Sequence, residues 1–296
     1  MRTFLLGFLD SHIYEETTAF NLARDGDFIF RKGLDKNERY SSEDTLIRYG
    51  DYTYPSYDSL FGRVINKARA IRHNCNKLRT HVFLWKNGFR VPRPFLTEKE
   101  IEETDLPVMR REVRHSRASD IKLITSMNSF IKGSFYTEFI PSDIEYRFHI
   151  MFNQCVRISR KVPQKEVLDL DNYIRSSSTG WTLTDNFEHK PELENEGIKL
   201  CIDALKALEL DFGACDVVIS KKDNLPYLLE VNTCPRLSPF GRKVYLKELY
   251  SHLEIPISDE LKEFLKSVKD FEFYDQLHVK YRKSRRFKPK PEDYGL

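Results

Sequence analysis

The chain has 296 residues, which is enough to bury substantial cores and suggests two domains or one domain of several lobes. Its 21 Phe and 15 Tyr argue against disorder over most of its length. The 48 basic residues nearly balance the 45 acidic ones, so the net charge gives no indication of a nucleic-acid or membrane partner. No apolar run approaches the roughly 20 residues of a membrane-spanning helix, so we expect no membrane segment.

Cysteine usage and the opening segment favour a cytoplasmic protein. The five cysteines are odd in number and lack CxxC spacing, which favours free thiols in a reducing compartment over disulfides or a zinc site. The opening MRTFLLGFLDSH turns polar too soon for a secretory signal, and we expect a first strand there.

Residues 1–75 are expected to form an N-terminal α/β lobe. Short strands are predicted at 3–8, 28–31 and 45–48, followed by a helix over about 63–73. Within this last segment Val64, Ala68 and Ile71 recur at steps of four and three, as one face of a helix requires.

Residues 76–133 are expected to form a second, smaller lobe. A helix begins near Lys77, and a charged helix is predicted at 97–103. Strands are predicted near Val108 and Ile121.

Residues 134–245 are expected to form a third lobe of strands with one long helix at 191–208. Apolar residues recur along this helix at the spacing of a single buried stripe. Residues 246–296 are expected to form a C-terminal helical extension that ends in a basic tail.

The most informative segment of the third lobe is a predicted β-hairpin, with apolar runs at 212–219 and 226–231 on either side of a polar turn. Asp216 and Glu230 lie about equally far from the turn and should face each other, while Glu230 and Asn232 share a strand face. Two buried carboxylates are costly without a cation, and oxygen ligands of this kind suit Mg²⁺. A surface hairpin with one acidic residue on each strand is the alternative.

The segments DFGACDVVI and LLEVNTCPRLS resemble the metal-binding end of the ATP-grasp superfamily, where an Asp, a Glu and an Asn at this spacing hold Mg²⁺ against the phosphates of ATP. The resemblance implies that Asp216, Glu230 and Asn232 are the metal ligands. It also implies an α+β fold in which two lobes clasp the nucleotide beside the N-terminal lobe. Because the two carboxylates would otherwise face the phosphates unscreened, we expect weak ATP binding without Mg²⁺.

The segment YTEFIPSDIEYRFHI is predicted to end one strand before Pro141, which takes Phe139 and Ile140 out of the ladder. Backbone groups outside a ladder can read the edge of an adenine ring. An ordinary strand–turn–strand with solvated carboxylates is the alternative. By the ATP-grasp resemblance this segment is the hinge, where Glu138 with the Phe139 and Ile140 backbone would hold adenine and Glu145 the ribose.

Several cations are candidates for contact with the phosphates. Arg147 follows Glu145 by two residues and shares its strand face, and its planar fork suits a phosphate or an acyl phosphate. Lys161, on an alternating strand, would also reach the phosphates. The resemblance adds Lys77, which opens a helix that ends in a glycine turn, and Arg111, at a position where the family commonly has a lysine.

The expected catalytic residues are Arg147, Lys161 and Arg236. Arg236, in the turn after the metal-binding strand, would orient the acceptor carboxylate together with Arg147, or would instead pair with Asp216. The implied reaction is an ATP-dependent carboxylate–amine ligation, with ATP and Mg²⁺ as cofactors. It proceeds through an acyl phosphate, releases ADP and phosphate, and uses small-molecule or peptide carboxylates and amines.

Two features keep other functions open. The loop from Arg114 to Asp120 lacks the glycines that such ligases commonly carry there, which would suit a nucleotide-binding regulatory module without turnover. The tail from Lys280 to Lys290 is basic, with interleaved aromatic residues that could stack on RNA bases. A solvated terminus is the commoner meaning of such a tail.

Overall fold

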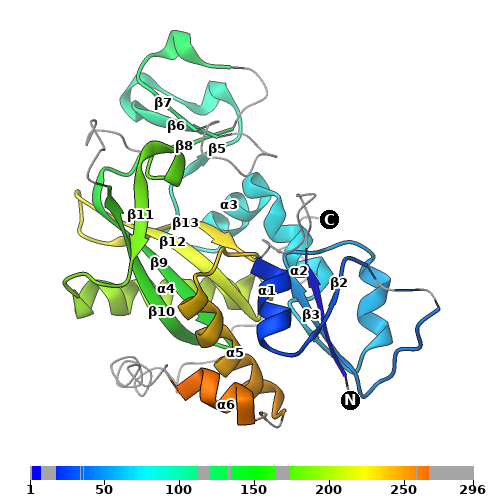
Figure 1. The fold of residues 1–296 in the computed structure, drawn as a ribbon. Helices are drawn as coiled ribbons and strands as arrows, with labels where there is room; N and C mark the ends of the chain where they lie inside the picture. Colours follow the sequence, from blue (N-terminus) through cyan, green and yellow to red (C-terminus); the bar gives the residue numbers. More distant parts are fainter. Residues whose placement is uncertain are drawn as a thin grey trace.

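The computed structural model describes residues 2–7, 18–33, 35, 37–111, 121–131, 135–164, 174–255, 257 and 259–266. Their strands form three sheets, and the helices pack on and between these sheets in an α+β architecture (Figure 1). The glycine-free loop and the basic tail singled out in the sequence lie outside the described residues. None of the helices in the described part of the chain combines the length and apolar character needed to cross a bilayer.

The N-terminal lobe contains a parallel sheet of order β2-β1-β3-β4. Its strands are β1 (Thr3–Gly7), β2 (Ile29–Arg31), β3 (Thr45–Tyr49) and β4 (Arg63–Ile65), and helix α1 (Thr18–Asp25) connects the first two. The three strands predicted from the sequence are therefore confirmed. All five residues of β3 are buried, as expected for a parallel sheet covered on both faces.

The predicted helix over 63–73 is wrong at its start. Residues Arg63–Ile65 form β4, which pairs with β3, and helix α2 (Ala68–Cys75) begins only afterwards. Asn66 separates the two elements with a φ of 57°, a left-handed conformation that no α-helix continues through. The β-branched residues before it favour an extended backbone.

The small lobe combines helix α3 (Lys77–Lys86) with an antiparallel sheet. The Asn76 side chain caps α3 by accepting from the Arg79 N–H at 3.0 Å, and Gly88, at a φ of 77°, provides the predicted glycine turn after the helix. The sheet has the order β5-β8-β6-β7, with β5 (Pro94–Phe95), β6 (Val108–Arg111), β7 (Lys122–Ile124) and β8 (Phe135–Glu138).

The charged helix predicted at 97–103 is absent from this fully described segment. Two short 3₁₀ turns, η3 (Glu98–Glu100) and η4 (Glu103–Asp105), take its place. Ile101, between them, is buried in the small-lobe core beside Phe95. A single apolar anchor among charged residues does not provide the continuous stripe that holds an α-helix against a core.

The third lobe is built on an antiparallel sheet of order β11-β10-β9-β12-β13. Its strands are β9 (Ser142–Met151), β10 (Gln154–Pro163), β11 (Trp181–Thr184), β12 (Phe212–Ser220) and β13 (Pro226–Asn232). Helix α4 (Pro191–Ala207) packs on one face, and its predicted apolar stripe is buried in the core. The opposite face carries the polar side chains of the candidate site.

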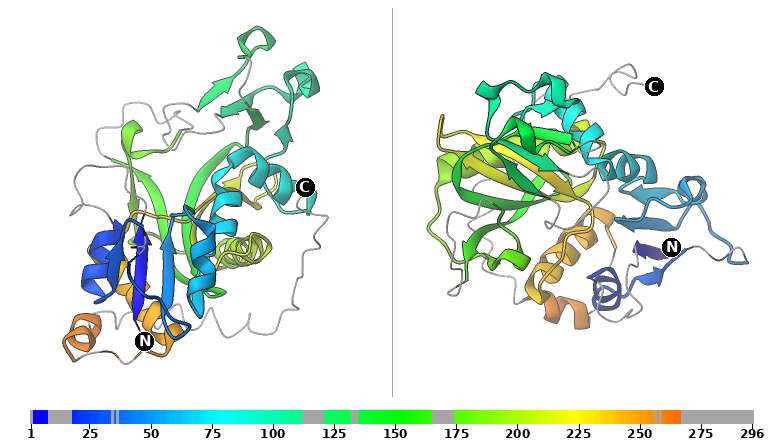
Figure 2. Two further views of the ribbon diagram at one scale, coloured as in Figure 1. Left: turned by 90° about the vertical axis from the view of Figure 1, so that its right-hand side faces the viewer. Right: turned by 90° about the horizontal axis from the view of Figure 1, so that it is seen from above.

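A second core joins the N-terminal lobe to the third lobe through helix α5 (Pro239–Leu253). It contains Ile47 and Tyr49 from β3, Phe212 from β12 and Tyr245 from α5. Seen from above, α5 lies between the N-terminal sheet and the third-lobe sheet (Figure 2). Helix α6 (Asp259–Lys266) follows against α5.

Candidate active site

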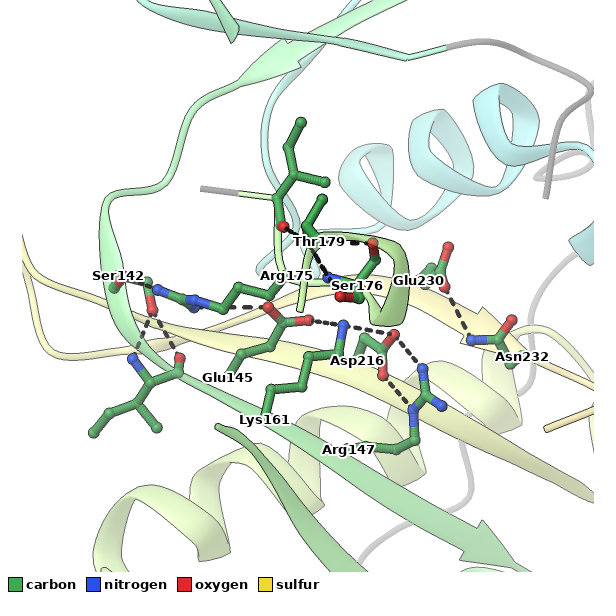
Figure 3. Close-up of polar contacts among 12 residues, drawn as sticks. Ser142, Glu145, Arg147, Lys161, Arg175, Ser176, Thr179, Asp216, Glu230 and Asn232 are labelled. Atoms are coloured by element: carbon green, nitrogen blue, oxygen red, sulfur yellow. Dashed lines mark hydrogen bonds and ion pairs between the residues drawn. The ribbon is translucent and has the colours of Figure 1, made fainter. Parts of the chain in front are cut away.

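The β12–β13 hairpin is confirmed, and its register places Asp216 directly opposite Glu230. Asp216 is buried at 3% exposure, whereas the Glu230 side chain is about one-third exposed, at 31%. Asn232 shares the face of Glu230, and its Nδ2 donates to Glu230 Oε1 at 3.0 Å (Figure 3). The three oxygen-bearing side chains proposed as metal ligands therefore come from one hairpin face.

Arg147 binds both oxygens of Asp216. The β9–β12 register sets the two residues opposite each other, with Arg147 Nε 2.6 Å from Oδ1 and Nη2 2.8 Å from Oδ2. Burial alone would raise the pKa of Asp216, but the Arg147 guanidinium and the Lys161 ammonium together hold it below its ordinary range. Arg236, the alternative partner considered for Asp216, is exposed in the turn after β13.

Lys161 bridges two carboxylates. Its Nζ lies 2.5 Å from Glu145 Oε1 and 3.7 Å from Asp216 Oδ2. Burial lowers the pKa of Lys161, but Asp216 and Glu145 outweigh it and raise that pKa. Glu145 itself is only 5% exposed. The strand alternation that placed Glu145 and Arg147 on one face is confirmed, and Lys161 of the neighbouring strand contacts this face.

Arg175 is a site residue to which the sequence pattern assigned no role. Its Nη1 lies 3.6 Å from Glu145 Oε2, and its Nη2 donates to the backbone carbonyl of Ser142. Its guanidinium lies over the Trp181 ring, 5.2 Å from the centroid. The available signal was an arginine five residues before a Gly-Trp pair, and the sequence gives it no role until the fold brings it to Glu145.

The small lobe contributes two further cations. Lys77, the first residue of α3, places Nζ 3.3 Å from Glu230 Oε2. Arg111, at the end of β6, is half-buried; burial lowers its pKa, while Glu230 and Glu145 oppose that shift. Nearby His81 has its pKa lowered to about 3 by burial and by Arg111 and Lys77, so its imidazole is neutral at physiological pH.

The predicted break between two strands is confirmed, because Phe139 and Ile140 lie between β8 and β9 and belong to neither. The Glu138 carboxylate accepts from the Arg93 N–H at 3.3 Å, and the Glu138 N–H donates to the Arg93 carbonyl at 2.8 Å. These bonds join the end of β8 to the segment between α3 and β5. The adenine contacts of Glu138, Phe139 and Ile140 stay predictions.

The donor set fits Mg²⁺. In the described part of the chain no three His, Cys, Asp or Glu side chains form a metal-binding group. Two carboxylates and an amide on one hairpin suit a magnesium ion that takes its remaining ligands from water and nucleotide phosphates.

No protein-family model and no curated protein matches the sequence. Among solved structures, the fold is similar to D-alanine–D-alanine ligase from Bacillus anthracis, with 15% identity and a TM-score of 0.60 over 91% of this chain and 98% of that one. It is similar to N5-carboxyaminoimidazole ribonucleotide synthetase from Thermotoga maritima, with 13% identity and a TM-score of 0.59 over 87% and 77% of the two chains. The ATP-grasp ligase PsnB matches at 12% identity and a TM-score of 0.54, over 91% of this chain and 100% of that one. The chain therefore has the ATP-grasp fold that its hairpin sequence led us to expect.

Proposed function

We propose that the chain is an ATP-dependent carboxylate–amine ligase that forms an acyl phosphate and releases ADP and phosphate. The observation that supports this proposal is a chain of ion pairs on the third-lobe sheet, from Arg147 through Asp216, Lys161 and Glu145 to Arg175. Beside it, Lys77 of the small lobe pairs with Glu230 of the same sheet. Phosphoryl transfer depends mainly on positioning and on charge neutralisation, and this arrangement supplies groups for both.

Asp216, Glu230 and Asn232 would hold Mg²⁺. When bound there, the ion would neutralise phosphate charge and polarise the γ-phosphate. Two similar structures support the use of these cofactors, since the Bacillus anthracis ligase was solved with ATP and PsnB with Mg and ADP.

Lys77, Arg111 and Lys161 are the proposed phosphate-binding cations. Lys77 and Lys161 each contact a carboxylate of the site, so nucleotide phosphates would offer them a second anionic partner within reach. Arg111 belongs to β6 of the small lobe and would bring positive charge to the nucleotide from that lobe.

The remaining site residues are proposed to bind either the adenosine part of the nucleotide or the acceptor carboxylate. Glu138, with the backbone of Phe139 and Ile140, would hold adenine, and Glu145 would accept from the ribose hydroxyls. Arg147 and Arg236 would orient the acceptor carboxylate and stabilise the acyl phosphate. We propose small-molecule or peptide carboxylates and amines as substrates.

Release of ADP and phosphate from Mg-ATP tests this function, with a panel of amino acids, peptides and amines as acceptors. Asp216→Asn should lower the rate by roughly 10²-fold or more, because it removes a ligand charge from the metal ion that would neutralise the reacting phosphate. Asp143→Asn is a matched control, since Asp143 is exposed at 74% and pairs with Lys221 instead. Tight nucleotide binding without ADP release under any condition would instead identify a regulatory module.

A further inference from the structure

Glu145 lies between two cations, Lys161 and Arg175. In the proposed reaction Lys161 would also bind the nucleotide phosphates. Lys161 contacts Glu145 Oε1 and also approaches Asp216, so it lies between these two carboxylates (Figure 3). Arg175 contacts the other oxygen, Oε2, from the opposite side. If Lys161 turns to the phosphates, Arg175 is the cation that stays against this buried carboxylate.

Arg175 is itself held in place by contacts that do not involve the proposed nucleotide. Its Nη2 donates to the carbonyl of Ser142, the first residue of β9, and its guanidinium lies over the Trp181 ring of β11. The side chain is only 8% exposed. Its Nε is buried without a hydrogen-bond partner among the described residues, so the guanidinium still has a donor to offer.

We propose that Arg175 is a positioning residue that fixes the Glu145 carboxylate for the ribose hydroxyls, and thereby sets a preference for ribonucleotides over 2′-deoxyribonucleotides. This inference rests on the proposed nucleotide site. A carboxylate aimed at two hydroxyls discriminates against a sugar that lacks one only if its own orientation is fixed. The contacts at Ser142 and Trp181 fix Arg175, and Arg175 fixes one oxygen of Glu145.

Binding calorimetry with ADP and 2′-deoxy-ADP, each with excess Mg²⁺, tests the proposal without knowledge of the acceptor substrate. The parent protein should bind ADP about tenfold more tightly than 2′-deoxy-ADP, which is the scale of one lost hydrogen bond to a charged group. Arg175→Met should weaken ADP binding and bring the ratio of the two dissociation constants close to one. Arg175→Lys, which keeps the charge, should restore part of the ratio.

Arg157→Met is the matched control. Arg157 also combines an ion pair with an aromatic contact, because it binds Asp185 at 2.8 Å and lies over Phe240, and its side chain is 12% exposed. It does not contact Glu145 in the described part of the chain, so this variant should keep the parental ratio. A purely structural role for Arg175 would lower the melting temperature of Arg175→Met but leave the ratio unchanged.

The outcomes separate this inference from the proposed function. If Arg175→Met and Arg175→Lys both keep the parental ratio of the two dissociation constants, the role of Arg175 is overturned. ADP release with a carboxylate and an amine would still support the proposed ligase. A parent protein that binds both nucleotides equally would overturn the inference without any variant. No nucleotide binding at all would overturn both proposals.

Discussion

Asp216 lies at the centre of the candidate site, because Arg147 binds both of its oxygens and Lys161 approaches one of them. From the sequence, the two hairpin carboxylates alone predicted weak ATP binding in the absence of Mg²⁺. In the structure, cations surround these two carboxylates. The cations should repel a free metal ion and attract the nucleotide phosphates. A metal ion on Asp216 must also displace a bidentate guanidinium.

Metal binding should therefore depend strongly on nucleotide. We expect the affinity for Mn²⁺, measured by its paramagnetic signal, to rise about tenfold or more when ADP is added, a coupling within the usual range for two linked sites. Arg147→Met should tighten Mn²⁺ binding without nucleotide and reduce this coupling. Arg157→Met serves as control because its ion pair with Asp185 is separate. Equal Mn²⁺ affinity with and without ADP in the parent would contradict this account.

Glu230→Gln separates catalysis from folding. The substitution keeps the volume but removes a charge where phosphate charge develops, so phosphoryl transfer should fall by roughly 10²-fold. Stability should change little, since Glu230 is partly exposed and its contact with Lys77, at 3.3 Å, resembles surface pairs that contribute about 0–1 kcal/mol. ADP release and urea unfolding measure the two effects. An unfolded variant would make Glu230 structural, and a parental rate would exclude it as a metal ligand.

The hinge carboxylates should affect nucleotide binding more than turnover. Glu138→Ala should raise KM for ATP more than it lowers kcat, because adenosine is bound alike in the ground and transition states. For Glu145 the better substitution is Gln, since Ala would leave Lys161 and Arg175 beside a buried gap without their carboxylate. Steady-state kinetics over a range of ATP concentrations checks both. Unchanged KM in both variants would remove the adenosine assignment.

At the scale of elements, the sequence predicted those features whose signal is local. The β12–β13 hairpin carries its turn and its alternation within about twenty residues, and the pairing of Asp216 with Glu230 followed from symmetry about the turn. The ion pair between Arg147 and Asp216 was not predictable in the same way, because it depends on the register between β9 and β12, strands with a long helix between them. Strand β4 was missed for another reason: it pairs with β3 in parallel, so no tight turn between them marks the pairing, and its own spacing also fits a helix.

Asn66, which separates β4 from α2, joins these elements to the start of β12. Its Nδ2 donates to the Phe212 carbonyl at 3.0 Å, and its Oδ1 accepts from the N–H groups of Asp211 and Phe212 at 2.7 and 3.1 Å. The residue is fully buried and holds a φ of 57°. Its side chain therefore satisfies buried backbone groups that have no ladder partner at this point.

Asn66→Ala should lower the free energy of unfolding by about 2–4 kcal/mol, because it leaves buried backbone groups unpaired and places Ala at a positive φ. Asn66→Gly removes the same hydrogen bonds but relieves the backbone strain, so it should cost about 1 kcal/mol less than Ala. Urea unfolding of the two variants measures the difference. A loss below about 0.5 kcal/mol for Ala would show that water replaces these bonds without cost.

At the scale of the whole molecule, the contacts between the lobes could not be predicted from the sequence. The N-terminal sheet shares a core with α5, and the Tyr49 hydroxyl donates to the Pro235 carbonyl in the turn that follows the metal-binding strand. These contacts join residues far apart in the chain, and no local pattern encodes them. They attach the N-terminal lobe directly to the candidate site. A substitution that destabilises this lobe should therefore also lower the free energy of global unfolding.

Asp44 in the N-terminal lobe provides a test of that cooperativity through pH. Hydrogen bonds from the side chain and backbone of Arg2 lower the pKa of Asp44 from its usual 3.8 to about 2, even though burial opposes the shift. The folded state thus keeps this carboxylate charged to a lower pH than the unfolded state does. The stabilisation it gives is fully present above about pH 4 and is lost as the pH falls towards 2.

Asp44→Asn should therefore be less stable than the parent at pH 7, and its stability should fall less steeply between pH 4 and pH 2. The two stability curves should approach each other near pH 2, where the parental carboxylate also becomes protonated. Urea unfolding at half-unit steps of pH, followed by the fluorescence of Trp85 and Trp181, both outside the N-terminal lobe, reports whether the rest of the molecule responds to this pair. Arg2→Met removes the partner and should flatten the curve similarly, and the double variant should add little to either change. Parallel curves for the parent and Asp44→Asn would mean that the Arg2–Asp44 pair is not coupled to global unfolding, and that the N-terminal lobe unfolds on its own.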